Sequence, residues 1–235
     1  MAGTLYLGTS GFAYPEWKGS FYPEGLKDDQ MLPFYAGRFP SVEINYTFRR
    51  FPIEKTLRTW AERTPEGFRF ALKANQRITH FRRLRDADGD VSDFLDRART
   101  LGERLGPILF QCPPTLQYDR ELIESFLGFL PPTFRCAFEF RHPSWSEARP
   151  ILRDQGAAWC IAETDATEPD SLPPIEEPFG FLRLRKEEYS DDELKRWADR
   201  LGGAIAEGLE VYAYLKHEEG VAAPRHAERI ATLLS

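Results

Sequence analysis

Short strand-like segments recur eight times along this chain, and stretches with helical periodicity separate most of them. They cover residues 5–9, 42–45, 68–73, 107–111, 137–141, 158–162, 179–185 and 210–216. Strands that alternate with helices favour a parallel sheet, and eight of them within 235 residues favour a closed barrel. The sequence therefore predicts an α/β fold with one domain over residues 1–235, a (β/α)8 TIM-like barrel. An open doubly wound sheet is the alternative, but no glycine-rich phosphate loop follows the first strand.

Helical patterns follow seven of the eight strands. They are expected near residues 29–37, 53–63, 91–105, 119–130, 146–155, 190–206 and 224–234. Asp119 is a candidate N-cap, and Ser190 with Glu193 has the spacing of a capping box. Residues 166–178 are rich in proline and acidic side chains and lack helical periodicity, so the helix after the sixth strand is expected to be missing or very short.

Charge and apolar patterning narrow the class of protein. A net charge of -6 argues against a protein that coats nucleic acid or anionic membrane non-specifically. No apolar run reaches the length of a bilayer span, and the first residues lack a signal-peptide pattern, so we expect a cytoplasmic protein. Cys112, Cys136 and Cys160 lack metal-ligand spacing and are expected to be buried, reduced thiols, with a nucleophilic Cys112 as the alternative.

The stretch from Phe138 to Trp145 contains the first candidate functional pair. Glu139 and Arg141 lie two positions apart on the predicted strand and therefore share one face, with Cβ atoms roughly 7 Å apart. Pro143 is expected to end this strand, and Ser144 to cap the helix that begins near Trp145. The pair is either part of a site or a structural ion pair.

Other strands end in the same way, with polar side chains on the face opposite the large apolar residues. These side chains are Glu43, Asn45, Lys73, Gln111, Glu139, Arg141, Arg183 and Lys216. Barrel enzymes place their chemistry at the carboxyl ends of the strands, and burying several charges without purpose is unfavourable. We therefore predict a ligand-binding or catalytic pocket there.

The residue types in this set limit the chemistry. Glu139, Glu43 and Asp165 are candidate acids and bases, and Lys73 is a candidate Schiff-base lysine or an ion-pair partner of Glu43. The cationic side chains predict a small anionic, phosphorylated or carboxylated substrate rather than the sugar that two carboxylates would also suit. The candidate substrate-binding residues are Tyr14, Trp17, Asn45, Gln111, Arg141, His142, Arg183, Arg185, Lys216 and His217.

Two further segments and the histidines allow alternatives. The loop from about residue 12 to 27 carries Tyr14 and Trp17, which either form a stacking wall or lid or only cap the barrel. The basic residues of 77–85 either contact phosphates or lie on solvated surface. No cofactor or metal is predicted, because the histidines lack ligand spacing; a divalent metal held by His142 or His217 with acidic neighbours is the minor alternative.

Several motifs together resemble the YecE-like family, a domain-of-unknown-function family. They are residues 8–14, 17–19, 21–23, 42–48, 51–52, 68–73, 106–114 and 139–145. The resemblance covers nearly the whole chain and implies a TIM-barrel fold with a pocket, but no settled activity. Family members favour His-Gly where Arg185-Lys186 stands and an Asn pair where Lys216-His217 stands, so this pocket is expected to be more cationic.

Three functions compete. The first is a hydrolase or lyase type of enzyme that uses Glu139 or Glu43 on a small anionic substrate. The second is a nucleic-acid-binding or phosphodiester-cleaving barrel, in which Tyr14 and Trp17 stack on bases and arginines hold phosphates. The third is a non-catalytic sensor that binds an anion. The acidic composition favours the first.

Overall fold

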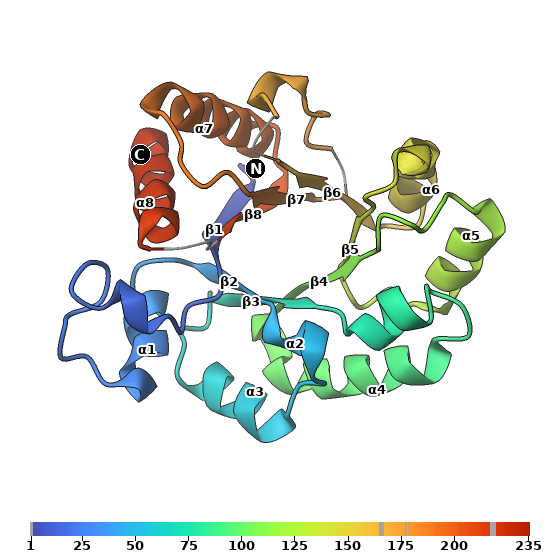
Figure 1. Ribbon diagram of the computed structural model, residues 1–235, viewed down its shortest axis with the longest axis horizontal. Helices are drawn as coiled ribbons and strands as arrows, with labels where there is room; N and C mark the ends of the chain where they lie inside the picture. The colour runs from blue at the N-terminus through green and yellow to red at the C-terminus, as the bar shows by residue number, and fades with distance from the viewer. Residues whose placement is uncertain (1, 165–166, 177, 217–219) are drawn as a thin grey trace. The chain divides into compact units, whose positions relative to one another are not determined.

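Eight parallel strands form a closed barrel in chain order, with helices around it (Figure 1), in a computed structural model that describes residues 2–164, 167–176, 178–216 and 220–235. The strands are β1 (Thr4–Ser10), β2 (Ser41–Ile44), β3 (Arg69–Lys73), β4 (Leu105–Gln111), β5 (Cys136–Glu139), β6 (Ala158–Ala162), β7 (Gly180–Leu184) and β8 (Glu210–Lys216). The predicted barrel is confirmed, and its eight strands fall where the period-two pattern placed them.

Helices follow most strands, as the periodicity predicted. They are α1 (Met31–Ala36), α2 (Tyr46–Arg49), α3 (Glu54–Glu62), α4 (Asp88–Ala98), α5 (Arg120–Phe129), α6 (Arg149–Asp154), α7 (Asp191–Ala206) and α8 (Ala222–Leu234). In the described residues between β6 and β7 the only helical element is the 3₁₀ turn η6 (Pro169–Ser171), which confirms the missing helix. No described helix is long and apolar enough to cross a membrane.

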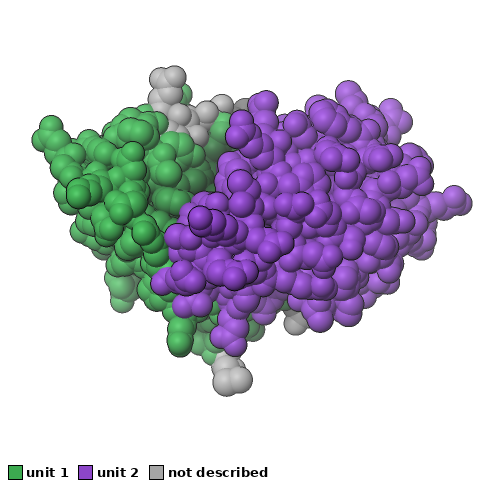
Figure 2. Space-filling view, turned by 90° about the horizontal axis from the view of Figure 1, so that it is seen from below, with its two compact units in different colours: residues 1–43, 63–69, 161–235 green, residues 44–62, 70–160 purple. Residues whose placement is uncertain are grey.

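The described chain divides into two compact units (Figure 2). Unit 1 comprises residues 1–43, 63–69 and 161–235, and unit 2 comprises residues 44–62 and 70–160. Neither unit is one continuous segment, and the prediction of a single domain stays a prediction. The two units are described separately below.

In unit 1, β1 pairs in register with β8 along its whole length, and β8 pairs with β7. Helices α7 and α8 pack on these strands (Figure 1). The capping box of α7 is present: the Ser190 hydroxyl accepts from the backbone N–H of Glu193, whose carboxylate accepts from the backbone N–H of Ser190. This confirms the sequence signature and fixes where α7 begins.

The aromatic loop after β1 packs into a small core of its own. Trp17 is completely buried and contacts Tyr14, Phe21 and Tyr22, and its Nε1 donates to the carbonyl of Gly220 at 2.9 Å. An indole held in this way stabilises the loop and has no face available for a base or a substrate. Of the two predicted alternatives for Trp17, its complete burial agrees with a packed structural role and not with an exposed stacking wall, because packing against neighbouring rings buries its aromatic surface.

In unit 2, β4 pairs with both β3 and β5, and the rings of Phe110 and Phe138 stack 5.1 Å apart. Helix α5 covers them through Phe126, and its N-cap Asp119 accepts from the backbone N–H of Leu122 at 3.0 Å, as predicted. Cys112, Cys136 and Cys160 are buried and free, which confirms the reduced thiols; burial raises the pKa of Cys112, so its thiol is not an activated nucleophile.

Two short elements of unit 2 were not predicted. They are α2 and the π-helix η3 (Arg77–Phe81). After the π-helix, Arg83, Leu84 and Asp86 have positive φ angles of 54°, 66° and 46°. Left-handed backbone is unfavourable for residues with a Cβ, and such strain clusters at functional sites, as π-helices do. This segment therefore bears directly on the candidate site.

Candidate functional site

The ends of β4 and β5 hold a buried carboxylate in place. Gln111 and Glu139 are register partners on these neighbouring strands, and Nε2 of Gln111 donates to Oε2 of Glu139 at 2.8 Å. Nε of Arg141 donates to Oε1 of Glu139 at 3.0 Å. The ion pair, one of the two alternatives for Glu139 and Arg141, is present. The prediction that both lie on one strand is wrong, because β5 ends at Glu139 and Arg141 lies in the following loop. Both carboxylate oxygens are therefore fixed.

Arg141 uses only part of its guanidinium in this ion pair. Its side chain is 35% exposed, whereas that of Glu139 is 3% exposed. Within the part of the chain that the structure describes, Arg141 bonds to protein only through Nε, so its two terminal nitrogens have no protein partner there. A guanidinium oriented through Nε presents a pair of parallel donors, which matches a phosphate or a carboxylate.

Lys73 ends β3 and is almost completely buried. Its Nζ lies 4.2 Å from the centre of the Phe48 ring, a cation–π contact. The hydroxyl of the neighbouring Thr47 donates to the carbonyl of Lys73 at 2.6 Å. The carbonyl of Thr47 accepts a hydrogen bond from Nδ2 of Asn75 at 3.0 Å. These bonds fix α2 against the end of β3, which is why Phe48 lies on the ammonium group. A pairing of Lys73 with Glu43, which lies in unit 1, stays a prediction.

His80 joins this group; it lies in the basic run of residues 77–85, for which contact with phosphates is one of the two predicted alternatives. Its ring lies 4.9 Å from that of Phe48, edge to face, and its Nδ1 is 2.9 Å from Oγ1 of Thr79. Burial lowers the pKa of His80, and the charges of Lys73, Arg141 and Arg83 lower it further. The signal that could have found it is a histidine inside an arginine-rich run after a strand. The sequence predicts either phosphate contact or solvated surface for that run.

The arginines around His80 are mostly neutralised. Arg77 and Arg82 pair with Asp90 at 2.9 and 3.6 Å, and Arg85 pairs with Asp119 at 2.7 Å. Arg83 donates to the carbonyl of Thr115 at 2.7 Å and to its hydroxyl at 3.0 Å. Three of these side chains are more than half exposed, so the basic run is largely solvated surface held by local acidic residues, one of the two predicted alternatives.

Two predicted binding residues of unit 2 lie elsewhere than expected. Asn45 follows β2 with helical dihedral angles and precedes α2, so it does not alternate with Glu43 on the strand; its buried Oδ1 has no hydrogen-bond partner among the described residues. His142, rather than Ser144, caps the next helical turn, η5 (Pro143–Ala148), because its Nδ1 accepts from the backbone N–H of Ser144 at 3.2 Å. Its imidazole thereby has a structural role.

Unit 1 holds a buried ion pair between Glu43 and Arg183. Nε of Arg183 lies 2.8 Å from Oε2, and Nη2 donates to Oε1, also at 2.8 Å; the side chains are 0% and 4% exposed. Ser10 adds a hydrogen bond to Oε1 at 2.9 Å. The predicted inward orientation of both residues agrees with this burial. A pair so well enclosed forms a rigid structural centre at the ends of β2 and β7.

Tyr14 and Lys216 lie near this pair. The hydroxyl of Tyr14 donates to the carbonyl of Ser10 at 2.7 Å, and burial together with the charge of Glu43 raises its pKa to about 12, so it stays protonated. Lys216 ends β8 as the register partner of Ser10 and is partly exposed. These placements leave their predicted roles in ligand binding open.

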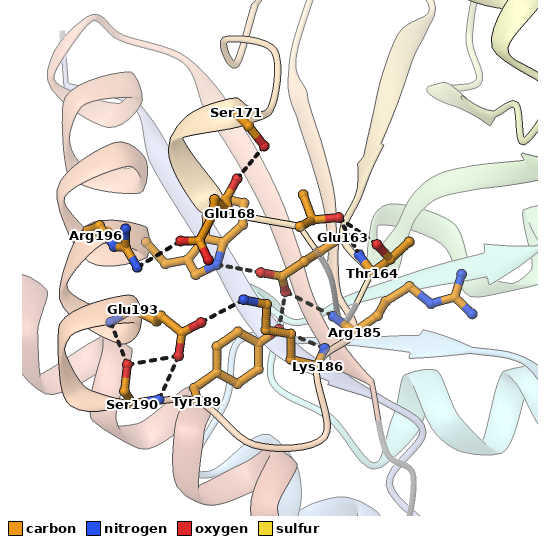
Figure 3. Close-up of polar contacts among 12 residues, drawn as sticks. Glu163, Thr164, Glu168, Ser171, Arg185, Lys186, Tyr189, Ser190, Glu193 and Arg196 are labelled. Atoms are coloured by element: carbon orange, nitrogen blue, oxygen red, sulfur yellow. Dashed lines mark hydrogen bonds and ion pairs between the residues drawn. The ribbon is translucent and has the colours of Figure 1, made fainter.

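A second polar centre of unit 1 surrounds Glu163, which follows β6 and was not predicted (Figure 3). Its carboxylate accepts from the hydroxyl of Tyr189, from Nε1 of Trp197 at 3.2 Å and from the backbone N–H of Arg185 at 3.2 Å. Burial raises the pKa of Glu163 against these donors. Figure 3 shows its carboxylate pointing toward Tyr189 and the backbone of Arg185, so it fixes the segment after β7.

Two predicted site residues, Asp165 and His217, lie outside the described residues. No cluster of three or more His, Cys, Asp or Glu side chains that could hold a metal ion occurs in the ranges the structure covers. The alternative of a bound divalent metal involves those two residues and therefore stays a prediction.

Fold and strand ends together define a parallel α/β barrel with polar side chains at the carboxyl ends of its strands. The chain belongs to the family described as "Protein of unknown function DUF72", whose model matches residues 6–235. This confirms the YecE-like resemblance.

Relatives and solved structures agree with this membership. The chain is 34% identical over 143 residues to the UPF0759 protein YecE of Escherichia coli K12, a match that covers 60% of this chain and 50% of YecE, so it spans about half the length of that curated relative. A DUF72 family protein of Thermotoga maritima superposes with a TM-score of 0.84 and 26% identity over 98% of this chain and 99% of the other. D-psicose 3-epimerase of Clostridium cellulolyticum H10 shares only the fold: its TM-score is 0.57 and its identity is 10%, over 100% and 98% of the chains.

Proposed function

We propose that this protein is an enzyme that binds a small anionic, phosphorylated substrate through Arg141 and acts on it by acid–base chemistry with Glu139. The observation that carries the proposal is that only part of the Arg141 guanidinium is bonded to protein. This group is held through Nε by a buried carboxylate, while its terminal nitrogens have no protein partner in the described chain.

The electrostatics of unit 2 support an anion as the ligand. Lys73, Arg141 and Arg83 all act on the imidazole of His80, and of these three cations Arg141 pairs with the buried carboxylate of Glu139. An anion bound to the fork of Arg141 would complete the charge balance with charge-assisted hydrogen bonds. It would also place a reacting group beside Glu139, where a proton transfer of the hydrolase or lyase type becomes feasible.

The two alternative functions receive less support. A nucleic-acid-binding surface needs unpaired cations along a groove, but Arg77, Arg82 and Arg85 already pair with aspartates, and the net charge of the chain is -6. A non-catalytic anion sensor would use the same guanidinium without turnover. The three free, buried cysteines favour a reducing compartment, so we propose a cytoplasmic location.

The test is a thermal-shift screen of the purified protein against inorganic phosphate, phosphorylated metabolites, carboxylates and short oligonucleotides. A ligand that binds the folded state raises the melting temperature by mass action. We expect a phosphorylated metabolite to raise the melting temperature. Arg141→Ala should lower the affinity for that metabolite by at least about tenfold, because hydrogen bonds to charged groups contribute about 1.5–3 kcal/mol. Product formation from that metabolite would then identify the reaction.

The matched control is Arg120→Ala. Arg120 lies on the surface of α5 in the same unit, is 69% exposed and pairs only locally with Glu124, so its loss should leave ligand affinity unchanged. Shifts with oligonucleotides alone would overturn the proposal in favour of nucleic-acid binding. Saturable binding without any turnover would favour the sensor.

A further inference from the structure

His80 belongs to the basic run of residues 77–85, for which the sequence left contact with phosphates as one of two alternatives. We infer that His80 is a further ligand-binding residue of this site, whose imidazole contacts the bound anion and takes up a proton from solvent when the anion binds. This inference rests on the proposed function, because it assigns a role within the site of Arg141.

The backbone that carries His80 is unusual in the described chain. Within the π-helix η3, the widened turn is closed by the bond from the N–H of Arg82 to the carbonyl of Arg77 at 2.8 Å. The N–H of Leu84 then bonds to the carbonyl of Ile78 at 3.0 Å across the left-handed residues. Left-handed backbone is strained for residues with a Cβ, so the rest of unit 2 must hold the segment in place.

Packing brings His80 and Lys73 onto the same ring. The imidazole contacts Phe48 at a centroid distance of 4.9 Å, and the ammonium of Lys73 lies 4.2 Å from the centre of that ring. Helix α2 is tied to β3 through Thr47, the residue before Phe48, which fixes the backbone that carries this ring. The imidazole is therefore held beside a buried cation.

One nitrogen of this imidazole is available to a ligand. Nδ1 is 2.9 Å from Oγ1 of Thr79, a completely buried hydroxyl, which orients the ring. Nε2 has no hydrogen-bond partner among the described residues. An oriented imidazole with one open nitrogen is the arrangement that proteins use to hydrogen bond a ligand.

The surrounding charges determine when this nitrogen is protonated. The charged groups that act on His80 are Lys73 from β3, Arg141 after β5 and Arg83 from its own segment. The carboxylates next to these elements are themselves paired: Glu139 with Arg141, and Asp90 with Arg77 and Arg82. Burial and the three cations lower the pKa of His80, so the free protein carries a neutral imidazole at neutral pH. A bound dianion opposes these charges and raises the pKa of His80. At a pH between the pKa values of the free and the anion-bound protein, binding is therefore accompanied by uptake of a proton.

Sulfate is a suitable probe, because it remains a dianion throughout the range from pH 5.5 to 8. We would measure its affinity for the full chain by calorimetry across that range, in two buffers of different ionisation enthalpy. For the natural protein we expect affinity to rise as pH falls, by up to about tenfold per pH unit where the linkage is complete, with measurable proton uptake. In His80→Gln the slope should be lost, while binding persists at high pH.

Four results separate this inference from the proposed function. If sulfate fails to bind, or binds equally to Arg141→Ala, the anion site itself is wrong. If binding depends on Arg141 but its affinity does not change with pH, or if His80→Gln keeps the slope, only the role of His80 is wrong. His226→Gln, a buried histidine of α8 in unit 1, should keep the slope of the natural protein.

A direct measurement covers the case in which His80→Gln does not fold. The chain has four histidines, and their imidazole resonances can be titrated by NMR in the natural protein with and without sulfate. We expect one resonance with a pKa below the ordinary range that rises when sulfate is added. Absence of any ligand-dependent histidine pKa would overturn the inference.

Discussion

Arg141 holds the buried carboxylate of Glu139 through Nε at 3.0 Å while a third of its own side chain stays exposed. Both carboxylate oxygens of Glu139 accept hydrogen bonds, whereas the terminal nitrogens of Arg141 have no protein partner among the described residues. The burial of one charge and the exposure of the other distinguish this pair from the enclosed pair of Glu43 and Arg183 in unit 1. The difference separates a candidate site from a structural ion pair.

Replacing Glu139 tests its chemical role. Glu139→Gln keeps the shape of the side chain but cannot exchange a proton, so we expect turnover of the identified substrate to fall by at least about 100-fold while binding changes little. The measurement compares kcat with ligand affinity. Glu124→Gln, on the exposed surface of α5, is the matched control and should retain full activity. Equal loss of binding and turnover would contradict an acid–base role.

The buried ion pair of unit 1 should contribute strongly to stability. Arg183→Met leaves the completely buried Glu43 without its cation, and we expect the free energy of unfolding to fall by about 3–5 kcal/mol. Adding Glu43→Gln should recover part of this loss, because the uncompensated charge is removed. Urea denaturation of both variants measures the coupling. A loss below about 1 kcal/mol, typical of an exposed pair, would contradict the assignment.

Two glycines of the first loop separate steric conflict from backbone strain. Gly11 has a φ of +95°, and a Cβ there would collide with the hydroxyl of Tyr14; Gly19 has a φ of +82° with nothing within 4 Å. Gly19→Ala should therefore lose only the strain, about 1 kcal/mol, and Gly11→Ala clearly more. Tyr14→Ala should reduce the effect of Gly11→Ala. Equal melting temperatures for the two glycine variants would contradict this packing.

Glu163 predicts a pH dependence of stability in unit 1. Burial raises its pKa above the ordinary value of 4.5, so the folded state binds its proton more tightly than the unfolded state does. Its contribution to stability is complete below pH 4.5 and is lost as pH rises through the folded-state pKa. In Glu163→Gln this loss should disappear when the free energy of unfolding is measured between pH 4 and 8.

Glu193 should give stability the opposite dependence on pH, because its pKa is lowered rather than raised. Its ion pair with Lys186 and its bonds to Ser190 lower its pKa to about 2, so its contribution is present above pH 4.5 and is lost as pH falls toward 2. Glu193→Gln should therefore lower the free energy of unfolding above pH 4.5, while its difference from the natural protein should vanish as pH falls toward 2. If the two glutamate variants shift the same side, the assignment of Glu163 is wrong.

Much of the architecture was predictable because it is encoded locally. Alternation with period two marks each strand, and the Ser190–Glu193 capping box and the Asp119 N-cap mark where α7 and α5 begin. The pairing of Glu139 with Arg141 was predictable for the same reason, since the two residues are separated by one position. Short-range patterns of this kind depend only on backbone geometry.

The short elements around His80 were not predictable in this way. Helix α2 has four residues and the π-helix five, too few to show a periodicity, and left-handed backbone at Arg83 and Leu84 has no sequence signature without glycine. Trp17 shows the same limit: its aromatic loop was recognised, but whether the indole faces solvent or neighbouring rings depended on packing.

The sequence by itself determined the barrel, the order of its strands and the polar character of their carboxyl ends, because period-two patterning and helix caps act within a few residues. Only the tertiary structure decided which charges meet. Glu43 pairs with Arg183, which lies 140 positions further along the chain, and Glu163 accepts hydrogen bonds from Tyr189 and Trp197. The reason is that the partner of a buried charge depends on which donors the packed strands and helices place beside it.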